Sequence, residues 1–314
     1  MTDIDQKILL PGGAGLVGQN LVVRLKRLGF KNLIVLDKHQ ENIEIMRSLH
    51  PEIHVEYADL AEQGNWERHF DGASSCVILQ AQIGASQAEP FVRNNIQSTH
   101  NVITAIKKNQ VPYTVHVSSS VVESVVRDNY TETKKAQENL VLESGITCIV
   151  LRPTLMFGWF DRKHLGWLSR FMKTFPIFPI PGNGRYMRQP LYVGDFCSII
   201  ISCLLNKAPQ GVYNISGVEK VYYIDIIRTI RKITGSRTLL LYLPISLFSI
   251  LLKTWAIFDP NPPFTVSQLM ALAAKDEFEV IDWESIFSVN STPFESAIQE
   301  TFNDPTYGQV VLKF

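Results

Sequence analysis

The sequence predicts an α/β fold: a doubly wound parallel sheet with helices on both faces, followed by a smaller C-terminal substrate-binding region. Two observations indicate it. Short apolar runs alternate with amphipathic segments through the first half of the chain, and a glycine-rich turn joins the first run to the first amphipathic segment. Alternation at this spacing is typical of strands that are connected by crossover helices. With 314 residues, the chain is long enough for two domains or one large one.

The first half of the chain shows the strands as apolar runs and the helices as periodic ones. Strands are predicted at residues 7–10, 32–36, 54–58, 75–79, 114–117 and 147–151. Helices are predicted between them, at residues 16–28, 42–49, 66–70, 91–109 and 130–144. Gly29 follows the first helix, where a glycine commonly ends one.

After Gly158 the alternation becomes irregular. Prolines and glycines crowd residues 176–184, which predicts loop and turn. The later predicted elements are helices at 191–205 and 224–234, a strand at 211–215, a break at 260–263 and an amphipathic helical region at 265–302.

Composition and charge exclude several classes of function. The 30 basic and 30 acidic residues balance, and no basic stripe carries interleaved aromatic residues, so we expect no nucleic-acid partner. Seven scattered histidines form no His-Glu-x-x-His pattern and the four cysteines form no close pairs, which predicts no metal site and buried, reduced thiols. The N-terminus is polar and acidic and lacks the features of a signal peptide, which predicts a cytoplasmic protein.

Residues 239–258 are almost wholly apolar, with Pro244 and Lys253 as the main interruptions. Their number is close to what a bilayer-spanning helix needs. The proline in the middle and the lysine favour a core or lid helix instead. A peripheral contact with the inner face of a membrane is left open.

The glycine-rich turn has the form Gly12-x-x-Gly15-x-x-Gly18, after a predicted strand and at the start of a predicted helix. Glycines at this spacing allow a tight turn, a close approach to a pyrophosphate and close packing of the helix. The first turn of the helix, with Leu16 and Val17, then offers unpaired N–H groups to the phosphates. In this context the motif predicts a Rossmann-type dinucleotide site.

Two acidic residues bear on which dinucleotide binds. Asp37 ends the second predicted strand, where a carboxylate accepts hydrogen bonds from the adenosine ribose and repels a 2′-phosphate, which favours NAD. A turn cap is the alternative role, and Lys38 and His39 leave NADP open. Asp59 follows the third strand, where a contact with adenine and a helix N-cap are equally good interpretations.

A second motif places a phenol and an ammonium one helical turn apart. Tyr130 and Lys134 lie four residues apart in a predicted helix and project from the same face. A nearby lysine and a positive nicotinamide would both favour the phenolate, which suits Tyr130 to general-base work. Ser120 follows the fifth predicted strand, where its hydroxyl can hydrogen-bond the reacting oxygen.

These residues resemble the NAD-dependent epimerase/dehydratase group of the extended short-chain dehydrogenase/reductase superfamily, from about residue 7 to about residue 235. The glycine turn, Asp59-Leu60 and the run Asn95 to Thr99 match motifs of that group. Ser118 to Ser120, followed by Tyr130-x-x-x-Lys134, match its catalytic set. The matches continue with Arg152-Pro153, Phe157-Gly158 and the segment from Arg188 to Asp195.

The resemblance implies roles for these residues. Tyr130 would be the acid/base, Lys134 would lower the pKa of Tyr130 and hold the nicotinamide ribose, and Ser120 would orient the substrate. Arg188 would hold a substrate phosphate, for which a surface salt bridge is the even alternative. The implied cofactor-binding residues are Gly12, Gly15, Leu16, Val17, Gly18, Asp37, Asp59, Leu60, Gln80, Ala81, Asn95, Ser118, Tyr130, Lys134 and Pro153.

The resemblance also implies a division of labour along the chain. Residues 1–158, with 190–215 returning to them, would form the NAD(P)-binding Rossmann domain. Residues 159–189 and 216–314 would form the substrate-binding region. The helices at 91–109 and 130–144 commonly pair across a dimer in the resembling group, so a homodimer is expected.

Several residues depart from the group's pattern. Gln80 and Gln82 flank Ala81 beside the expected nicotinamide site, and nine residues separate Ser120 from Tyr130, which shortens a loop that shapes the sugar pocket. Leu155 stands where many nucleotide-sugar enzymes carry an asparagine that binds the substrate diphosphate. The C-terminal region resembles atypical members, among them a polyprenyl-diphosphate-sugar epimerase and an accessory subunit of respiratory complex I.

The leading interpretation is an enzyme that transfers a hydride at a sugar hydroxyl, C4, of a nucleotide- or polyprenyl-diphosphate-linked sugar. An NAD(P)H-dependent keto-sugar or hydroxysteroid-type reductase would use the same residues. A non-catalytic NAD(P)-binding scaffold subunit is the alternative of another class. The retained Ser120, Tyr130 and Lys134 favour catalysis.

Overall fold

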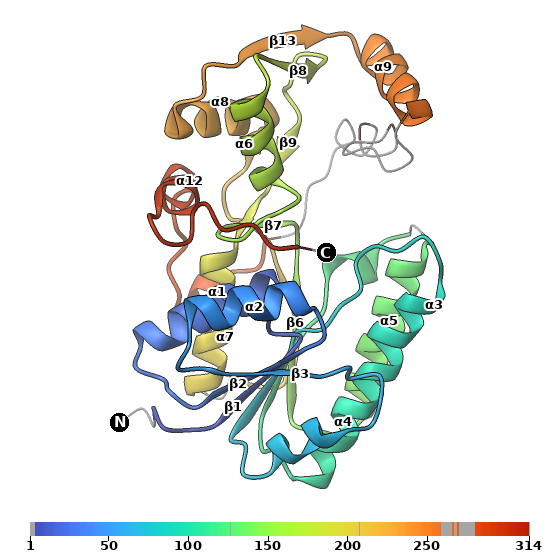
Figure 1. Ribbon diagram of the computed structural model, residues 1–314, viewed down its shortest axis with the longest axis vertical. Helices are drawn as coiled ribbons and strands as arrows, with labels where there is room; N and C mark the ends of the chain where they lie inside the picture. The colour runs from blue at the N-terminus through green and yellow to red at the C-terminus, as the bar shows by residue number, and fades with distance from the viewer. Residues whose placement is uncertain are drawn as a thin grey trace.

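Seven parallel strands form the central sheet, in the order β11-β6-β5-β4-β1-β2-β3 (Figure 1). The computed structural model describes residues 4–125, 127–206, 208–258, 266, 269 and 280–313. The strands are β1 (Ile8–Pro11), β2 (Leu33–Asp37), β3 (His54–Tyr57), β4 (Ser75–Ile78), β5 (Thr114–Val117), β6 (Cys148–Pro153) and β11 (Gly211–Ile215). The predicted α/β fold with a parallel sheet is confirmed.

The strand order reverses between β1 and β4. From β1 the chain builds outward to β2 and β3, then returns to the other side of β1 and builds outward through β4, β5 and β6. Ligands of open α/β sheets bind outside the carboxyl ends of the strands at such a reversal. The fold therefore places the predicted site at this edge.

Helices cover both faces of the sheet (Figure 1). The first group is α1 (Leu16–Arg27), α2 (Gln40–Leu49) and α7 (Val193–Asn206), and the second is the 3₁₀ helix η1 (Asn65–Phe70), α4 (Ser98–Lys108) and α5 (Asn129–Glu143). Alternate residues of β1 face the two groups: Ile8 and Leu10 pack in the cluster that contains α1 and α7, whereas Leu9 packs in the cluster that contains α4 and η1. Burial on both faces explains why the strands read as continuous apolar runs.

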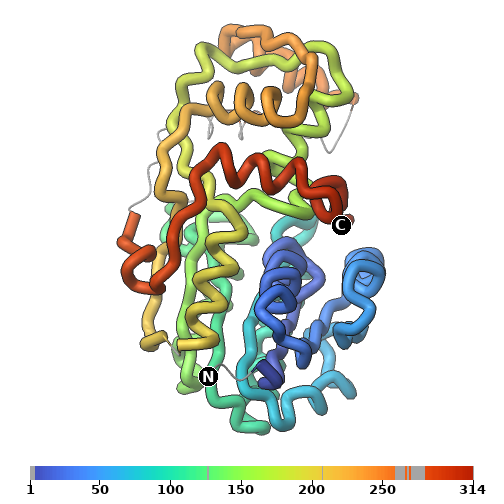
Figure 2. Tube along the Cα trace, turned by 90° about the vertical axis from the view of Figure 1, so that its left-hand side faces the viewer, coloured from blue at the N-terminus to red at the C-terminus, as the bar shows by residue number. Residues whose placement is uncertain are grey.

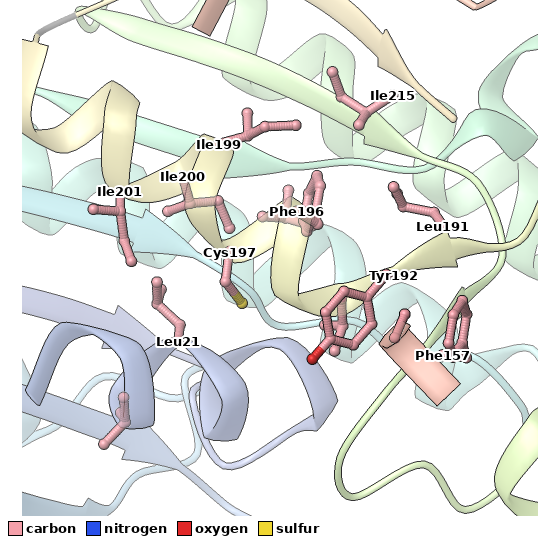
Figure 3. Close-up of a cluster of buried hydrophobic side chains, with 14 of the residues drawn as sticks. Leu21, Phe157, Leu191, Tyr192, Phe196, Cys197, Ile199, Ile200, Ile201 and Ile215 are labelled. Atoms are coloured by element: carbon pink, nitrogen blue, oxygen red, sulfur yellow. The ribbon is translucent and has the colours of Figure 1, made fainter. Parts of the chain in front are cut away.

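The larger core lies between the sheet and the pair α1 and α7. Figure 3 shows Phe196, Cys197 and three isoleucines of α7 facing Leu21 of α1 and Ile215 of β11. Phe196 and Cys197 are fully buried. Cys76 and Cys203 are also buried, Cys148 is half-buried, and all four thiols are free.

The predicted helix at 91–109 contains an irregular turn. α3 (Glu89–Phe91) is followed by the π-helical segment η2 (Val92–Gln97), which runs into α4. π-helical turns inside longer helices are frequent at functional sites. Here the turn contains Asn94 and Asn95, whose side chains both bond to Gln82 in the loop after β4.

The C-terminal part of the chain forms the other end of the molecule (Figure 1). It contains α6 (Leu165–Thr174), β8 (Ile177–Pro181), β9 (Met187–Arg188), β12 (Val221–Tyr222), α8 (Tyr223–Thr234), β13 (Leu239–Leu243) and α9 (Ile245–Phe258). Two further short strands, β7 (Met156–Phe157) and β10 (Leu191–Tyr192), pair with each other below it. The division into a cofactor domain and a substrate region stays a prediction.

Two predictions for this region are wrong. Residues 176–184 contain the strand β8, which pairs with β13 in parallel, because prolines are tolerated in a two-stranded sheet whose strands are both edges. Residues 239–258 do not form one helix, since β13 ends before Pro244 and α9 begins after it. Phe248 is the buried side chain of α9, so this helix does not belong to the core.

The last predicted helical region is also divided. The break predicted at 260–263 and most of residues 265–279 lie outside the described residues. Beyond them the chain forms two separate helices, α11 (Trp283–Phe287) and α12 (Phe294–Asn303). Ser288 ends α11 in the left-handed conformation (φ 53°), and Pro293 precedes α12. No helix in the described part of the chain combines the length and the apolar character that crossing a bilayer requires.

The C-terminal segment returns to the Rossmann elements. Figure 2 shows α12 and the residues after it crossing beside α1 and α2. Arg24 of α1 pairs with Glu300 of α12 at 3.3 Å, and its guanidinium lies 4.5 Å from the centre of the Trp159 ring. Asn42 of α2 exchanges two hydrogen bonds with the backbone of Lys313. These contacts join the end of the chain to its beginning.

We predict that Phe196→Ala lowers the free energy of unfolding by about 3–5 kcal/mol, because the truncated ring leaves a cavity in the larger core. Urea unfolding followed by far-UV circular dichroism measures it. Leu142→Ala is the control, since Leu142 is 50% exposed and its truncation should cost less than about 1 kcal/mol. Equal losses in the two variants would contradict the assignment of the core.

Candidate active site

The carboxyl ends of five parallel strands meet at one edge of the sheet and bring the predicted motifs together. The strands are β1, β2, β4, β5 and β6, and they end at Pro11, Asp37, Ile78, Val117 and Pro153. The glycine turn follows the first of them, and Ser118 to Ser120 follow the fourth. Pro153 is buried at the end of β6, opposite Ile215.

The glycine turn is fixed by two close approaches. A Cβ atom on Gly12, where φ is +76°, would lie 2.3 Å from the backbone nitrogen of Gln80. A Cβ atom on Gly18 would lie 2.1 Å from the carbonyl oxygen of Gly13. A side chain at either position would push the turn away from β4 or from α1, so the fold itself requires both glycines.

Gly15 differs from these two, because the space beside it is open. The nearest atom to a Cβ atom there is the Gly12 oxygen, at 3.6 Å. Gly15 is the N-cap of α1, no side chain caps the helix, and no acidic residue lies in its first turn. Leu16 and Val17 follow, both half-buried. An uncapped helix start beside open space fits the phosphates of a dinucleotide.

Asp37 is fixed beside the turn. Its two carboxylate oxygens accept hydrogen bonds from the N–H groups of Ala14, at 3.0 Å, and His39, at 2.9 Å. Burial raises the pKa of the Asp37 carboxyl, and these two hydrogen bonds oppose the shift. The carboxylate thereby stabilises the turn from the end of β2, where a dinucleotide ribose would lie.

Asp59 forms an ion pair with Lys38. The Asp59 carboxylate accepts a hydrogen bond from Arg93 at 2.9 Å and lies 3.7 Å from the Lys38 ammonium. Lys38 also donates to the side chain of Asn94. This lysine is therefore engaged in an ion pair. Binding of the 2′-phosphate of NADP would need a free cation, so the arrangement fits NAD better than NADP. The neighbouring Leu60 is buried in the smaller core.

Tyr130 lies in the first turn of α5, which Asp128 caps by accepting a hydrogen bond from the N–H of Thr131 at 2.7 Å. The Ser119 side chain lies close enough to the Tyr130 hydroxyl to lower the pKa of this phenol. Sequence reasoning had selected Ser120 instead, the first residue of the 3₁₀ helix η3 (Ser120–Glu123). Adjacent serines cannot be distinguished by spacing, so the role of Ser120 stays a prediction and Ser119 is the neighbouring candidate.

Burial raises the pKa of Tyr130, with the Ser119 hydrogen bond lowering it and the Asp128 charge raising it further. The expected lowering of the Tyr130 pKa by Lys134 is not among the causes of this shift. The Lys134 ammonium donates to the Val117 carbonyl at 3.3 Å and to the side-chain oxygen of Gln137. Lys134 is 1% exposed, and burial lowers its pKa to about 7, although the Glu138 charge opposes the shift.

A network of amide side chains joins α5 to the loop after β4. Gln137 donates to the Gln80 carbonyl at 3.2 Å and to the Thr99 hydroxyl at 2.8 Å. Gln80 also donates to the Thr99 hydroxyl, at 3.2 Å. Gln80, which departs from the pattern of the resembling group, therefore connects the glycine turn, α4 and α5. Ala81 next to it is exposed.

Asn95 has a positioning role in this structure. It is fully buried, accepts a hydrogen bond from the N–H of Gln82 at 2.6 Å, and donates to the Gln82 carbonyl and to the Thr133 hydroxyl. Its side chain thus holds the loop after β4 against α5. The implied contact of Asn95 with the cofactor stays a prediction.

Ser118 and Arg152 share a buried carboxylate on the other side of α5. Glu138 accepts hydrogen bonds from the Ser118 hydroxyl and from the guanidinium of Arg152. Arg152 also pairs with Glu123 at 2.8 Å. Burying a carboxylate is costly unless it is paired, and here the pair joins α5 to β5 and β6. The implied contact of Ser118 with the cofactor stays a prediction.

Two basic residues lie in the segments that follow β6. Arg188, the predicted phosphate-binding residue, is half-buried in β9 and donates to the Met187 carbonyl at 3.0 Å. Sequence reasoning missed Lys163, whose ammonium would lie 3.9 Å from a Cβ atom on Gly84, in the loop after β4. The carboxylate of Asp161 orders this turn by accepting hydrogen bonds from the N–H groups of Lys163 and Gly166.

Outside this edge, the structure gathers His54, Glu56 and His69 on the surface of β3 and η1. Their ligand-type atoms lie within 4.8 Å of one another. The Glu56 carboxylate is engaged by His69 at 2.8 Å and by Arg68 at 3.1 Å. The sequence spacing gives no signal for this cluster, because its members come from different elements.

Comparison with known proteins agrees with this geometry. The sequence matches the model of the NAD dependent epimerase/dehydratase family over residues 8–216. The chain therefore belongs to this family and is an NAD-dependent enzyme of the short-chain dehydrogenase/reductase superfamily. The resemblance predicted from the sequence is confirmed.

Individual relatives differ in what they act on. An N-acetyl-alpha-D-glucosaminyl-diphospho-ditrans,octacis-undecaprenol 4-epimerase of Escherichia coli O157:H7 is 25% identical, over 71% of this chain and 68% of that protein. A ceramide reductase of Caulobacter vibrioides is 22% identical, over 96% of this chain and 92% of that protein. The UDP-glucuronic acid 4-epimerase of Bacillus cereus in complex with NAD has a similar fold, with a TM-score of 0.70 at 20% identity, over 94% of this chain and 96% of that one.

We predict that Gly15→Ala weakens NAD binding at least about tenfold, or about 1.4 kcal/mol, and leaves the unfolding temperature nearly unchanged. The added methyl group makes only ordinary contacts within the protein but occupies the open space at the start of α1. Gly18→Ala is the contrasting variant, because its methyl group would lie 2.1 Å from a backbone oxygen and should destabilise the fold. Calorimetry with NAD and thermal unfolding separate the two effects. Unchanged affinity in Gly15→Ala would place the phosphates elsewhere.

We predict that Lys134→Met is most stable relative to the natural protein near pH 6, and that this advantage shrinks by about 2–5 kcal/mol by pH 10. Because the pKa of buried Lys134 is about 7, the unfolded chain binds the extra proton between pH 7 and its ordinary pKa. The natural protein therefore gains stability as the pH rises through this window. Urea unfolding at several pH values measures the slope.

Lys135→Met is the control for this slope, because the Lys135 side chain is 35% exposed and should show no comparable change with pH. Loss of the hydrogen bond to Gln137 adds a cost to Lys134→Met that does not vary with pH. A difference in stability that is constant from pH 6 to pH 10 would contradict a neutral, buried Lys134.

Proposed function

We propose that this enzyme transfers a hydride at the C4 hydroxyl of a sugar that is carried on a diphosphate, linked either to a nucleotide or to a polyprenyl chain. The observation that carries the proposal is the position of Tyr130 in the first turn of α5, beside the serines that follow β5 and at the sheet edge that also holds the glycine turn. Two hydroxyls at this place can hold the oxygen of a reacting alcohol or ketone.

Oxidation of the alcohol removes a proton from its oxygen and a hydride from the carbon that carries it. Bound NAD supplies the hydride acceptor and, in the reverse direction, the hydride donor. Tyr130 takes the proton from the oxygen and returns it on reduction, while Ser119 donates a hydrogen bond to the same oxygen. Return of the hydride to the other face of the ketone inverts the carbon, which is epimerisation.

The state of Tyr130 favours the reductive half of this cycle. Its pKa is raised by burial, so the phenol is protonated at neutral pH and ready to donate to a ketone oxygen. The Ser119 hydrogen bond acts in the opposite direction, since it stabilises the phenolate that the oxidative half requires.

Two cations support a diphosphate substrate. Arg188 on β9 and Lys163 before α6 lie in the segments that follow the sixth strand of the sheet. The polyprenyl-linked form is supported by the relative from Escherichia coli O157:H7 and by Leu155, which is 49% exposed where nucleotide-sugar enzymes commonly carry asparagine. We also retain the expected homodimer, through α4 and α5, as a prediction.

A second candidate function is the NAD(P)H-dependent reduction of a carbonyl on a lipid. The ceramide reductase supports it, because the match spans 96% of this chain and so includes the C-terminal region. The same Tyr130 and Ser119 would then donate to the ketone oxygen, without the return step.

One experiment separates the two candidates. The purified protein is denatured and any released nucleotide is identified, and the native protein is incubated with UDP-N-acetylglucosamine and with its polyprenyl-diphosphate counterpart. Co-purified NAD and interconversion without added cofactor would support the epimerase. A protein that is free of nucleotide and consumes NAD(P)H only with a keto substrate would support the reductase.

We predict that Tyr130→Phe lowers kcat about 10³-fold and changes the affinity for NAD less than about threefold, because the phenyl ring keeps its packing but cannot transfer a proton. Ser119→Ala should lower kcat about 10²-fold. Ser120→Ala is the matched control and should keep kcat within about threefold. If Ser120→Ala is the impaired variant and Ser119→Ala is not, the original sequence assignment is restored.

A further inference from the structure

The strand β13 and the helix α9 carry a continuous apolar surface. Residues 237–258 contain no acidic residue, and their two charged residues are Arg237 and Lys253. Ile257 and Phe258 are 78% and 83% exposed. The other large exposed side chains of this surface are Leu239, Leu241, Tyr242, Leu247, Ile250, Leu251 and Trp255. Scattered apolar residues are ordinary at a protein surface, but a contiguous group of this size marks an interaction site.

The surface lies at one end of the molecule. Figure 1 shows β13 and α9 at the end opposite to the central sheet, with α8 directly beside β13. Among the described strands, β13 pairs with β8, and Phe248 is the buried side chain of α9. The arrangement leaves this end free to approach a flat surface without obstruction by the sheet and its helices.

Basic residues border the apolar surface. Arg228, Arg231 and Lys232 of α8 line a hollow together with Leu240 and Tyr242 of β13. The Arg228 guanidinium donates to the Tyr242 hydroxyl at 3.3 Å, so the basic and apolar parts are in contact.

The basic border keeps a net positive charge. Asp225 pairs with Arg228, and Glu295 pairs with Lys232, both as exposed pairs that a competing anion can replace. Arg231 donates to a backbone carbonyl, and Arg237 lies at the start of the apolar segment. Three guanidinium or ammonium groups around one hollow suit a phosphate group.

We propose that β13, α9 and the basic hollow of α8 form a docking surface for a bilayer that contains anionic phospholipids. The apolar side chains enter the interface, and the hollow receives a lipid phosphate. α9 has 14 residues and is too short to span a bilayer, so it lies in the interface instead. A bilayer matches the charge of this surface, whereas a second copy of the chain would bring two basic hollows together. The proposal goes beyond the catalysed reaction and does not depend on its substrate.

Sedimentation with vesicles tests the proposal, with vesicles of phosphatidylcholine alone and vesicles that also contain phosphatidylglycerol. We expect binding to the mixed vesicles that is at least about tenfold stronger than to phosphatidylcholine alone and that weakens as salt is added. The double variant Ile257→Ser/Phe258→Ser should lose at least about tenfold in binding. Its control, Leu28→Ser/Leu142→Ser, replaces two apolar residues of the Rossmann part that are 52% and 50% exposed, and it should bind like the natural protein.

The basic hollow is tested by Arg231→Gln/Lys232→Gln, which should remove the preference for phosphatidylglycerol. Arg68→Gln/Lys108→Gln, two exposed cations of the Rossmann part, is the matched control. Inorganic phosphate should release no more protein than sodium chloride of equal ionic strength. Release by phosphate alone, equal binding in all variants, or no binding to mixed vesicles would each overturn the proposal.

A second copy of the chain is the competing occupant. Sedimentation velocity would show it as a self-association that Ile257→Ser/Phe258→Ser abolishes while vesicle binding is absent, and this result would overturn the proposal. Turnover of soluble substrates should be the same in the docking variants and the natural protein. Failure of vesicle binding is therefore distinguishable from failure of the proposed reaction.

Discussion

The backbone at Gln80 is the contact on which the active site depends. On one side it lies so close to Gly12 that a Cβ atom there would be 2.3 Å from its nitrogen. On the other side its carbonyl accepts a hydrogen bond from Gln137, one turn beyond Lys134 on α5. The backbone of one residue, Gln80, thus contacts both the turn that receives the dinucleotide and the helix that carries Tyr130. A shift of β4 would move both together. Pre-set spacing between cofactor and acid/base is what hydride transfer requires.

The buried charges of α5 explain how this helix keeps its orientation. Glu138 is paired with Arg152 and Ser118, and Lys134 donates to Gln137 and to the Val117 carbonyl. Arg152, Ser118 and the Val117 carbonyl lie at the ends of β5 and β6. A rotation of the helix would leave the buried Glu138 carboxylate unpaired and would remove the hydrogen bond from Lys134 to Val117. Tyr130 lies one turn nearer the N-terminus, where the helix reaches the edge of the sheet and becomes half-exposed. The buried contacts of Lys134 and Glu138 therefore fix the position of Tyr130.

Sequence predicted the elements that local periodicity determines and missed those that depend on tertiary direction. The strands at 114–117 and 211–215 and the glycine turn were found, because an apolar run and a glycine spacing are local signals. Spacing selected Ser120, and only the direction of the hydroxyl distinguishes it from the neighbouring Ser119. β8 was missed because Pro179 and Pro181 resemble turn residues, although an edge strand tolerates them. The apolar run 239–258 predicts burial by composition, and Pro244 was used only as an argument against a spanning helix, although it divides the run into β13 and α9.

The edge of the sheet that carries Tyr130 and the apolar surface of β13 and α9 lie at different ends of the molecule and differ in character. At the sheet edge, Lys134, Gln137 and Asn95 are held by hydrogen bonds within the protein, which fixes α5 before any ligand binds. At the end of the molecule formed by β13 and α9, Ile257 and Phe258 expose apolar surface to water, which is unfavourable, and they lie outside the core. Exposed apolar side chains of this kind suit a contact outside the chain. Among the described residues, β13 pairs with β8 and contacts α8 through Tyr242 and Arg228. We therefore expect changes at β13 and α9 to affect such a contact and to leave the chemistry at Tyr130 unchanged.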